Sequence, residues 1–426
     1  MGAEMDLGLS VNSAHAWPCP RWLLSLMVLL VGFLFDGLLL RAEEPKNQAA
    51  RFAVRAEVAH QELSPKFCWF HPRAAALPGF GTDGRPAVII TLQKHLAADD
   101  HYSGLYQLRS DDLGKSWSGP TEIPELAWQA GPNGETIAVC DVTPGWHAPT
   151  KKLLAIGIKL RYSPTGKQLL DQPRSHEPAY AVYDPQQAKW SRWKMLAVPD
   201  SDNKFFLNSP GCVQWLVKPD GELLLPTYYQ RRGKIDYEAT VLQCRFDGET
   251  LSYVRQGSDL AISGGRGFAE PSLAVCGGRY YLTLRNDARG YVSQSEDGLS
   301  YTEPRPWMFD DGTELGSYNT QAHWLIHGEK LYLCYTRKGA MNDHIPRNRA
   351  PIFMAEVDRK KLQVLRATEQ SVLPERGVML GNFGAAAITD QESWITDAEF
   401  LVGTQPHPRG ANGSLWIGRI RWTDAR

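Results

Sequence analysis

The sequence lacks an excess of charge of either sign. Its 426 residues include 46 lysines and arginines and 47 aspartates and glutamates, which gives a formal net charge of -1. A protein that binds nucleic acid usually carries a basic excess, so the balance argues against nucleic acid as a partner. Hydrophobic residues make up 43% and charged residues 22% of the chain, which excludes a disordered or fibrous protein.

Long apolar runs are absent after residue 42, so we expect no membrane span in that part of the chain. The run Trp22–Phe35 is too short for a spanning helix, which needs about 20 apolar residues. It suits a signal peptide, whose apolar region is about 7–15 residues long. We therefore predict an export signal over residues 1–42, cleaved near Ala42, and a secreted or periplasmic protein. A retained membrane anchor is the alternative.

Closely spaced cysteine pairs are also missing. No CxxC motif and no mixed His/Cys spacing occurs, so the sequence predicts no metal site, and nothing in it demands an organic cofactor. Six cysteines follow the predicted signal: Cys68, Cys140, Cys212, Cys244, Cys276 and Cys334. An even count in an exported protein permits disulfides of unknown pairing, and buried free thiols are the alternative.

Helical periodicity is scarce, and a β pattern repeats six times in its place. Each copy has a turn and a β-rich run, then a variable loop and a second β-rich run. The first runs are residues 84–92, 151–159, 221–229, 278–286, 329–337 and 392–400. The second runs are residues 104–110, 179–184, 239–246, 290–297, 352–358 and 414–422. Turns between such runs agree with the 38 glycines and 28 prolines of the chain.

These repeats predict an all-β fold, a six-bladed β-propeller of four-stranded antiparallel blades over residues 52–426. One blade cannot bury both of its faces, whereas six blades around an axis can. We expect the strand 52–60 to join the last blade and close the ring, and we expect no second domain. A pair of β-sandwiches is the alternative, and six copies argue against it.

A turn motif of the form Ser-x-Asp-x-Gly-x-x-Trp recurs within the repeats. It is complete in residues 110–117, shortened in 295–301 and degenerate in 183–190. Asp112 is expected to accept backbone hydrogen bonds, Gly114 to adopt a positive φ and Trp117 to pack beneath the turn. The motif matches the Asp-box, a structural turn without chemistry. Together with the blade pattern, it makes residues 52–426 resemble the sialidase (neuraminidase) superfamily of six-bladed propellers.

The resemblance implies an exo-glycoside hydrolase that acts on a terminal carboxylated sugar, sialic acid or a related one. The family holds the substrate carboxylate with three arginines, because guanidinium groups match carboxylate geometry. The matching positions are Arg73, Arg285 and Arg349, with Arg347 as a rival for the third. The implied partner is an acidic glycan or sialoglycoconjugate.

The family's acid/base aspartate matches Asp100, with Asp99 as the alternative. Glu270 matches the glutamate that assists a tyrosine nucleophile in the family. At the position expected for this tyrosine the chain has Phe383, and no tyrosine follows Tyr335. Without this phenol the nucleophile is either water, which would invert the configuration, or a tyrosine from elsewhere, which would retain it.

The missing tyrosine also favours a second class of function, a non-catalytic lectin-like propeller that binds acidic glycans. Such a protein would need the arginines and could dispense with Asp100. A scaffold that binds proteins and lacks clustered arginines is a third hypothesis. Tyr318 and Tyr335 are candidates to enter from a neighbouring blade, and His344 is a candidate second acid/base in the loop before Arg349.

Overall fold

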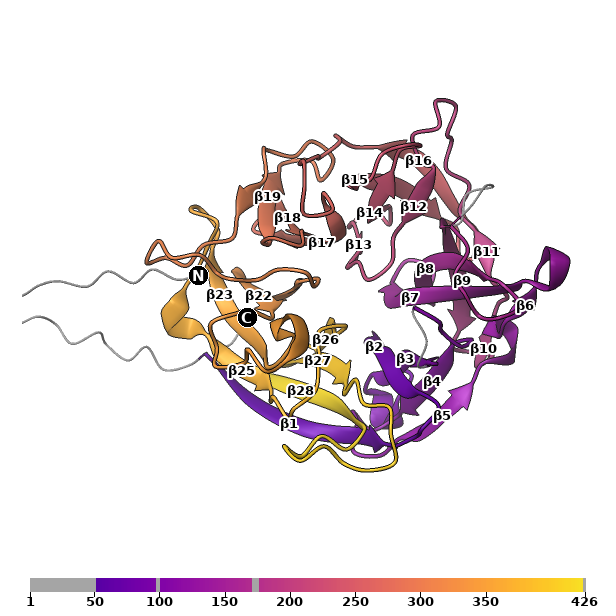
Figure 1. Cartoon of the computed structure of the whole chain (residues 1–426), viewed down its shortest axis with the longest axis horizontal. Coiled ribbons are helices and arrows are strands. Elements are labelled where there is room, and N and C mark those ends of the chain that lie inside the picture. Colours follow the sequence, from indigo (N-terminus) through magenta and orange to yellow (C-terminus); the bar gives the residue numbers. More distant parts are fainter. Residues whose placement is uncertain (1–50, 97–99, 171–175, 424–426) are drawn as a thin grey trace, which may run out of the picture. The chain divides into compact units, whose positions relative to one another are not determined.

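The computed structural model describes residues 51–96, 100–170 and 176–423. The predicted signal, residues 1–42, and the alternative acid/base Asp99 lie outside these residues. The described strands form six antiparallel sheets that are the blades of a six-bladed β-propeller (Figure 1). The predicted fold class is therefore confirmed. Among the described residues, no helix is long and apolar enough to cross a membrane.

The first three blades follow the chain order. Blade 1 contains β2 (Cys68–Leu77), β3 (Ala87–His95), β4 (Tyr106–Ser110) and β5 (Ser118–Glu122). Blade 2 contains β6 (Gln129–Ala130), β7 (Thr136–His147), β8 (Lys152–Tyr162), β9 (Glu177–Asp184), β10 (Lys189–Trp190) and β11 (Lys194–Met195). Blade 3 contains β12 (Leu207–Ser209), β13 (Leu216–Val217), β14 (Leu223–Gln230), β15 (Glu238–Phe246) and β16 (Leu251–Gln256).

The other three blades continue around the ring. Blade 4 contains β17 (Ala269–Cys276), β18 (Arg279–Arg285), β19 (Tyr291–Ser295) and β20 (Arg305–Pro306). Blade 5 contains β21 (His323–His327), β22 (Lys330–Tyr335), β23 (Ile352–Asp358), β24 (Gln363–Val364) and β25 (Gln370–Leu373). Blade 6 contains β26 (Gly384–Thr389), β27 (Glu392–Ala398), β28 (Ser414–Trp422) and β1 (Phe52–Gln61). The short 3-10 helices are η1 (Thr82–Gly84), η2 (Pro124–Leu126), η3 (Pro132–Gly134), η4 (Pro346–Asn348) and η5 (Arg366–Thr368).

Blade 6 closes the ring by combining the first strand of the propeller with the last three. Strand β1 pairs antiparallel with β28, with Phe52 opposite Trp422 and Gln61 opposite Ser414. The pairing agrees with the role predicted for residues 52–60. Phe52 is buried and packs edge-on against Trp422, so the closing strand is held by side chains as well as by its ladder.

The hydrophobic core lies between the blades. Among the described residues, seven clusters of buried side chains join neighbouring blades, two of them between blades 1 and 2 and one at every other contact around the ring. Between blades 6 and 1, for example, Trp394 and Ile417 pack against Ile90 and Leu108. Because the apolar faces are covered in this way, the axis of the propeller is left for polar side chains.

The turn between β4 and β5 has the predicted hydrogen bonds. Asp112 Oδ1 accepts from the Ser116 amide at 2.9 Å, and Gly114 has φ of 77°. The hydrogen bonds with Ser116, the largest effect, lower the pKa of Asp112 to about 2. Trp117 packs against Trp394, with ring centroids 6.0 Å apart, so this turn ties blade 1 to blade 6.

Two further turns repeat this arrangement, and none of the three reaches the axis. Asp297 accepts from the amides of Leu299 and Ser300 at 2.8 and 2.7 Å, and Asp184 accepts from that of Gln186 at 3.0 Å. The three turns follow β4, β9 and β19. The six cysteines after the predicted signal are free and buried, so the free-thiol alternative holds for them.

Candidate functional site

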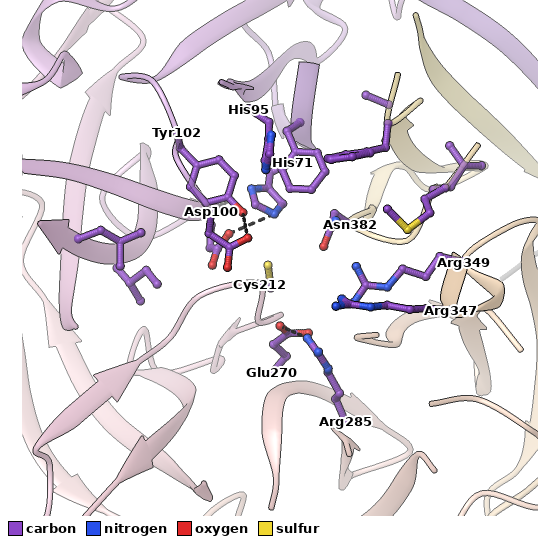
Figure 2. Close-up of a pocket in the computed structure, with 18 of the residues that line it drawn as sticks. His71, His95, Asp100, Tyr102, Cys212, Glu270, Arg285, Arg347, Arg349 and Asn382 are labelled. Carbon is purple, nitrogen blue, oxygen red and sulfur yellow. Dashed lines mark hydrogen bonds and ion pairs between the residues drawn. The ribbon is translucent and has the colours of Figure 1, made fainter. Parts of the chain in front are cut away.

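Bulges interrupt the strands nearest the axis. The pairing of β2, β7 and β17 with the following strand shifts in register at each bulge, and in blade 3 a gap separates β12 from β13. A non-glycine residue with φ between 44° and 57° occupies each of these four positions: His71, Asp141, Cys212 and Glu270. Such backbone costs about 1–3 kcal/mol per residue and concentrates at functional sites. In this protein the left-handed backbone directs these four polar side chains into one cavity (Figure 2).

That space is a cavity of about 870 Å³, within the size range of small-ligand sites. Every blade contributes to its wall. Its polar lining includes His71, His95, Asp100, Tyr102, Asp141, Cys212, Glu270, Arg285, Arg347, Arg349, Asn382 and Asp397. Arg285, Arg347 and Arg349 lie together with Glu270 on one side of the cavity, apart from Asp100 (Figure 2).

Arg285, Arg347 and Arg349 form one wall of the cavity, the arginine wall. Asn319, in the loop before β21, binds two of them. Arg285 donates from Nη1 to Glu270 Oε1 at 2.5 Å and from Nη2 to Asn319 Oδ1 at 2.8 Å. Arg349 donates from Nε and Nη2 to the carbonyl of Asn319, at 3.1 and 2.5 Å. Arg347 adds a third guanidinium to the lining. Asn319 therefore holds Arg285 and Arg349 side by side, as the predicted carboxylate clamp requires.

Arg285 and Arg349 differ in their carboxylate partners and therefore in the direction of their pKa shifts. Glu270 outweighs the effect of burial on Arg285 and holds its pKa above the ordinary value. Burial, reinforced by repulsion from Arg285, lowers the pKa of Arg349 to about 10. Within the described residues, no carboxylate forms an ion pair with Arg349, although its side chain is only 6% exposed. A buried guanidinium without a counter-ion is costly, so this wall favours the binding of an anion.

Arg73 does not line the large cavity but lies close to its wall. The bulge at His71 inserts a residue into β2, so His71 lines the large cavity, and Arg73 Nη1 donates to the Val142 carbonyl at 3.4 Å. Arg73 is 2% exposed and lines a separate cavity of about 120 Å³ with His323 and Gln214. Its charge, like those of Arg285 and Arg349, lowers the pKa of Glu270.

The acidic side contains Asp100 and a carboxyl that the sequence did not reveal. Asp100 is exposed and accepts from the Tyr102 hydroxyl at 3.2 Å. Asp141 lies 3.1 Å from His71 Nε2, and burial, partly offset by Arg73, raises its pKa to about 7. Asp141 could have been predicted from its place inside the apolar run AVCDV. A carboxyl in a buried strand usually has a function or a charged partner.

Phe383 does not line the large cavity. It is fully buried and packs edge-on against His323, with centroids 5.0 Å apart, while its neighbour Asn382 lines the cavity. Three other candidates are also absent from the lining: Tyr318 donates to Asn348 at 2.7 Å, Tyr335 donates to Glu369 at 2.7 Å, and His344 lies 3.2 Å from Glu375.

Phenol groups do reach the cavity from other positions. The lining tyrosines are Tyr102, Tyr228 and Tyr237. Burial raises the pKa of Tyr228 well above its ordinary value, and the nearby Glu270 carboxylate raises it further. A phenol next to this glutamate therefore comes from blade 3, rather than from the last blade.

No protein-family model matches the chain, and no curated protein does. Solved structures do match. A protein of unknown function from Dyadobacter fermentans is 13% identical with a TM-score of 0.61, over 87% of this chain and 99% of that one. Hadza microbial sialidase Hz136 is 13% identical with a TM-score of 0.57, over 83% and 66%. Trypanosoma rangeli sialidase in complex with sialic acid is 15% identical with a TM-score of 0.54, over 88% and 60%.

These matches show that the chain has the fold of the sialidase propellers, as the sequence resemblance predicted. The NanB sialidase of Streptococcus pneumoniae matches as well, with a TM-score of 0.54 over 85% of this chain. The chain spans 66% of the Hz136 sialidase and 60% of the T. rangeli chain. At such low identity the likeness concerns the fold alone.

Proposed function

We propose that this protein is an exo-glycoside hydrolase of the sialidase type that removes a terminal carboxylated sugar. The observation that carries the proposal is Arg349, a buried guanidinium without an ion-pairing carboxylate among the described residues, held beside Arg285 on the wall of a sugar-sized cavity. A cationic wall and a separate acidic side suit a substrate with a carboxylate at one end and a scissile bond at the other. The likeness to a sialidase with bound sialic acid supports this choice of ligand.

In the proposed reaction, Arg285 and Arg349 hold the substrate carboxylate by paired, charge-assisted hydrogen bonds. The anomeric carbon then lies between the two walls, and Asp100 donates a proton to the leaving oxygen. Glu270 keeps Arg285 in place. The attacking group is a water, with inversion of configuration, or the Tyr228 phenol, with retention. In either case Glu270 Oε2, which has no hydrogen-bond partner among the described residues, accepts the proton that the attacking group loses. Proton NMR of the first sugar released distinguishes the two outcomes.

The test of the proposal is turnover of aryl glycosides of sialic acid, deaminated sialic acid, glucuronic acid and galactose. We expect cleavage of an acidic glycoside and none of the galactoside. Arg349→Gln should lower kcat/KM by about 10- to 100-fold, the value of one charge-assisted contact. Arg55→Gln, which removes an arginine 81% exposed on β1, is the matched control and should change nothing. Unchanged turnover by the Arg349 variant would refute the proposed clamp.

A lectin-like propeller is the second candidate, favoured by Phe383 in the position predicted for the nucleophile. Calorimetric titration with sialyllactose separates the two functions. A lectin would bind without releasing sugar, and Asp100→Asn would leave its affinity unchanged. A hydrolase would release sugar, and the same variant would bind without turnover.

We also propose that residues 1–42 direct export, so that the protein acts in a secreted or periplasmic location. The apolar run Trp22–Phe35 supports this. N-terminal sequencing of the protein from the expressing cells tests it. A mature chain that starts near residue 43 and is found outside the cytoplasm is the expected result, and an uncleaved cytoplasmic chain would contradict it.

A further inference from the structure

The inner strands of blades 1, 2 and 3 bring three kinds of metal ligand together. One ligand atom from each of His71, Asp141 and Cys212 lies within 4.8 Å of the other two. His71 Nε2 and Asp141 Oδ1 are 3.1 Å apart. The three residues are far apart in the sequence, so only the closed propeller creates the cluster. For this reason the sequence contains no spacing motif that predicts the cluster.

Besides one another, these side chains have two polar neighbours, Asn382 beside His71 and Arg73 beside Cys212. His71 is 3% exposed, and its Nδ1 has no hydrogen-bond partner among the described residues, although Asn382 lies near the ring. Cys212 is 2% exposed and free. All three residues hold left-handed backbone, with φ of 52°, 56° and 57°. A buried ring nitrogen without a partner and three strained positions at one point are the features of a ligand site rather than of ordinary packing.

We propose that His71, Asp141 and Cys212 bind a divalent transition-metal ion, zinc in preference. Nitrogen, oxygen and sulfur ligands together suit zinc, and a thiolate disfavours magnesium and calcium. All three residues line the large cavity, so three protein ligands would leave the fourth position open towards it.

The charges of the proposed ligands match that of the ion. Asp141 and a Cys212 thiolate would supply two negative charges for an ion of charge two. A bound metal ion deprotonates a coordinating thiol outright.

The test measures metal binding and needs no substrate, so it is independent of the proposed hydrolase activity. The full chain, carrying Cys19→Ser to remove the one cysteine before residue 42, is stripped with a chelator and mixed with zinc or cobalt. After gel filtration we expect about one ion per chain. The cobalt form should show a thiolate-to-cobalt charge-transfer absorption.

Two variants assign the site. Cys212→Ser should abolish the charge-transfer absorption and weaken zinc binding at least about 10-fold, whereas Cys244→Ser, which changes another buried thiol of blade 3, should preserve both. His71→Gln should weaken zinc binding without removing the sulfur ligand. No retained ion in the parent protein, or an unchanged absorption in Cys212→Ser, would overturn the proposal. Circular dichroism establishes that each variant is folded.

Discussion

Glu270 and Arg285 form a 2.5 Å ion pair between the adjacent strands β17 and β18 of blade 4. The side chains are 13% and 7% exposed. Glu270 reaches Arg285 from a bulge with φ of 44°, so the strained backbone and the ion pair depend on each other. Burial alone would raise the pKa of Glu270, but Arg285 outweighs burial and lowers it. Blade 4 thus presents a charged, hydrogen-bonded guanidinium before any substrate arrives.

Removal of either Glu270 or Arg285 alone should destabilise the folded protein. We expect Glu270→Gln to lower the free energy of unfolding by about 3 kcal/mol, because Arg285 stays buried with only the more distant carboxylate of Asp287, 3.4 Å from its Nη2, as a counter-ion. The double variant Glu270→Gln/Arg285→Gln should recover part of that loss, since it buries no lone charge. Urea unfolding of the four proteins measures the coupling. Strictly additive losses would show that the pair contributes nothing as a pair.

Asp100→Asn should reveal the role of Asp100 through its dependence on the leaving group. If the carboxyl protonates the leaving oxygen, kcat falls by about 100-fold or more for a sugar leaving group and much less for an activated phenol. Asp111→Asn, which changes an aspartate on the outer turn that pairs with Arg109, is the control. Equal losses for both classes of substrate would show that Asp100 only positions the substrate.

The turns after β4, β9 and β19 should contribute to the stability of the fold without affecting catalysis. Asp297→Ala removes hydrogen bonds to the amides of Leu299 and Ser300 on the exposed rim. We expect a loss of about 1 kcal/mol in the free energy of unfolding and unchanged kcat/KM. Thermal unfolding and steady-state kinetics of the same preparation measure both quantities. A fall in kcat/KM would mean that the turn acts on the cavity.

Stability should decrease in acid because His323 is buried in its neutral form. Burial, reinforced by Arg73, lowers the pKa of His323 to about 3, whereas the unfolded chain has a value of about 6.5. A lowered folded-state pKa means that the contribution is complete above pH 6.5 and declines as the pH falls towards 3. His323→Asn should therefore show a smaller decrease in Tm between pH 7 and pH 4 than the parent protein. Parallel curves would exclude His323 as a source of the acid sensitivity.

The closing strand should be essential to the stability of the whole ring. Phe52 is 4% exposed and contacts Tyr332 of blade 5 and Trp422 of blade 6. We expect Phe52→Ala to cost about 3–5 kcal/mol, as for other buried phenylalanines. Val58→Ala changes a side chain of the same strand that is 44% exposed, and it should cost far less. Equal losses from the two substitutions would indicate that β1 is held by its backbone ladder alone.

The sequence predicted the strands well because alternating apolar runs between turns depend on local chemistry. Glu270, Arg285 and Arg349 were predicted from the resemblance to the sialidase family, and Asn319 and the ion pair of Glu270 with Arg285 bring them together. His71, Asp141 and Cys212 were missed as a group because each stands at an irregular position of an inner strand. A bulge shifts the alternation of side chains, so the strand pattern alone could not show that His71 lines the cavity.

Blade 6, which combines the first strand of the propeller with the last three, also determines when the ring can close during synthesis of the chain. Strand β1 leaves the ribosome first, yet its partner β28 is synthesised some 360 residues later, after roughly 20 to 70 seconds at ordinary elongation rates. Until then β1 has an unpaired edge that invites association with other chains. The ring therefore closes only after translation of the propeller is almost complete, and a chaperone that covers β1 during this delay would raise the yield of folded protein.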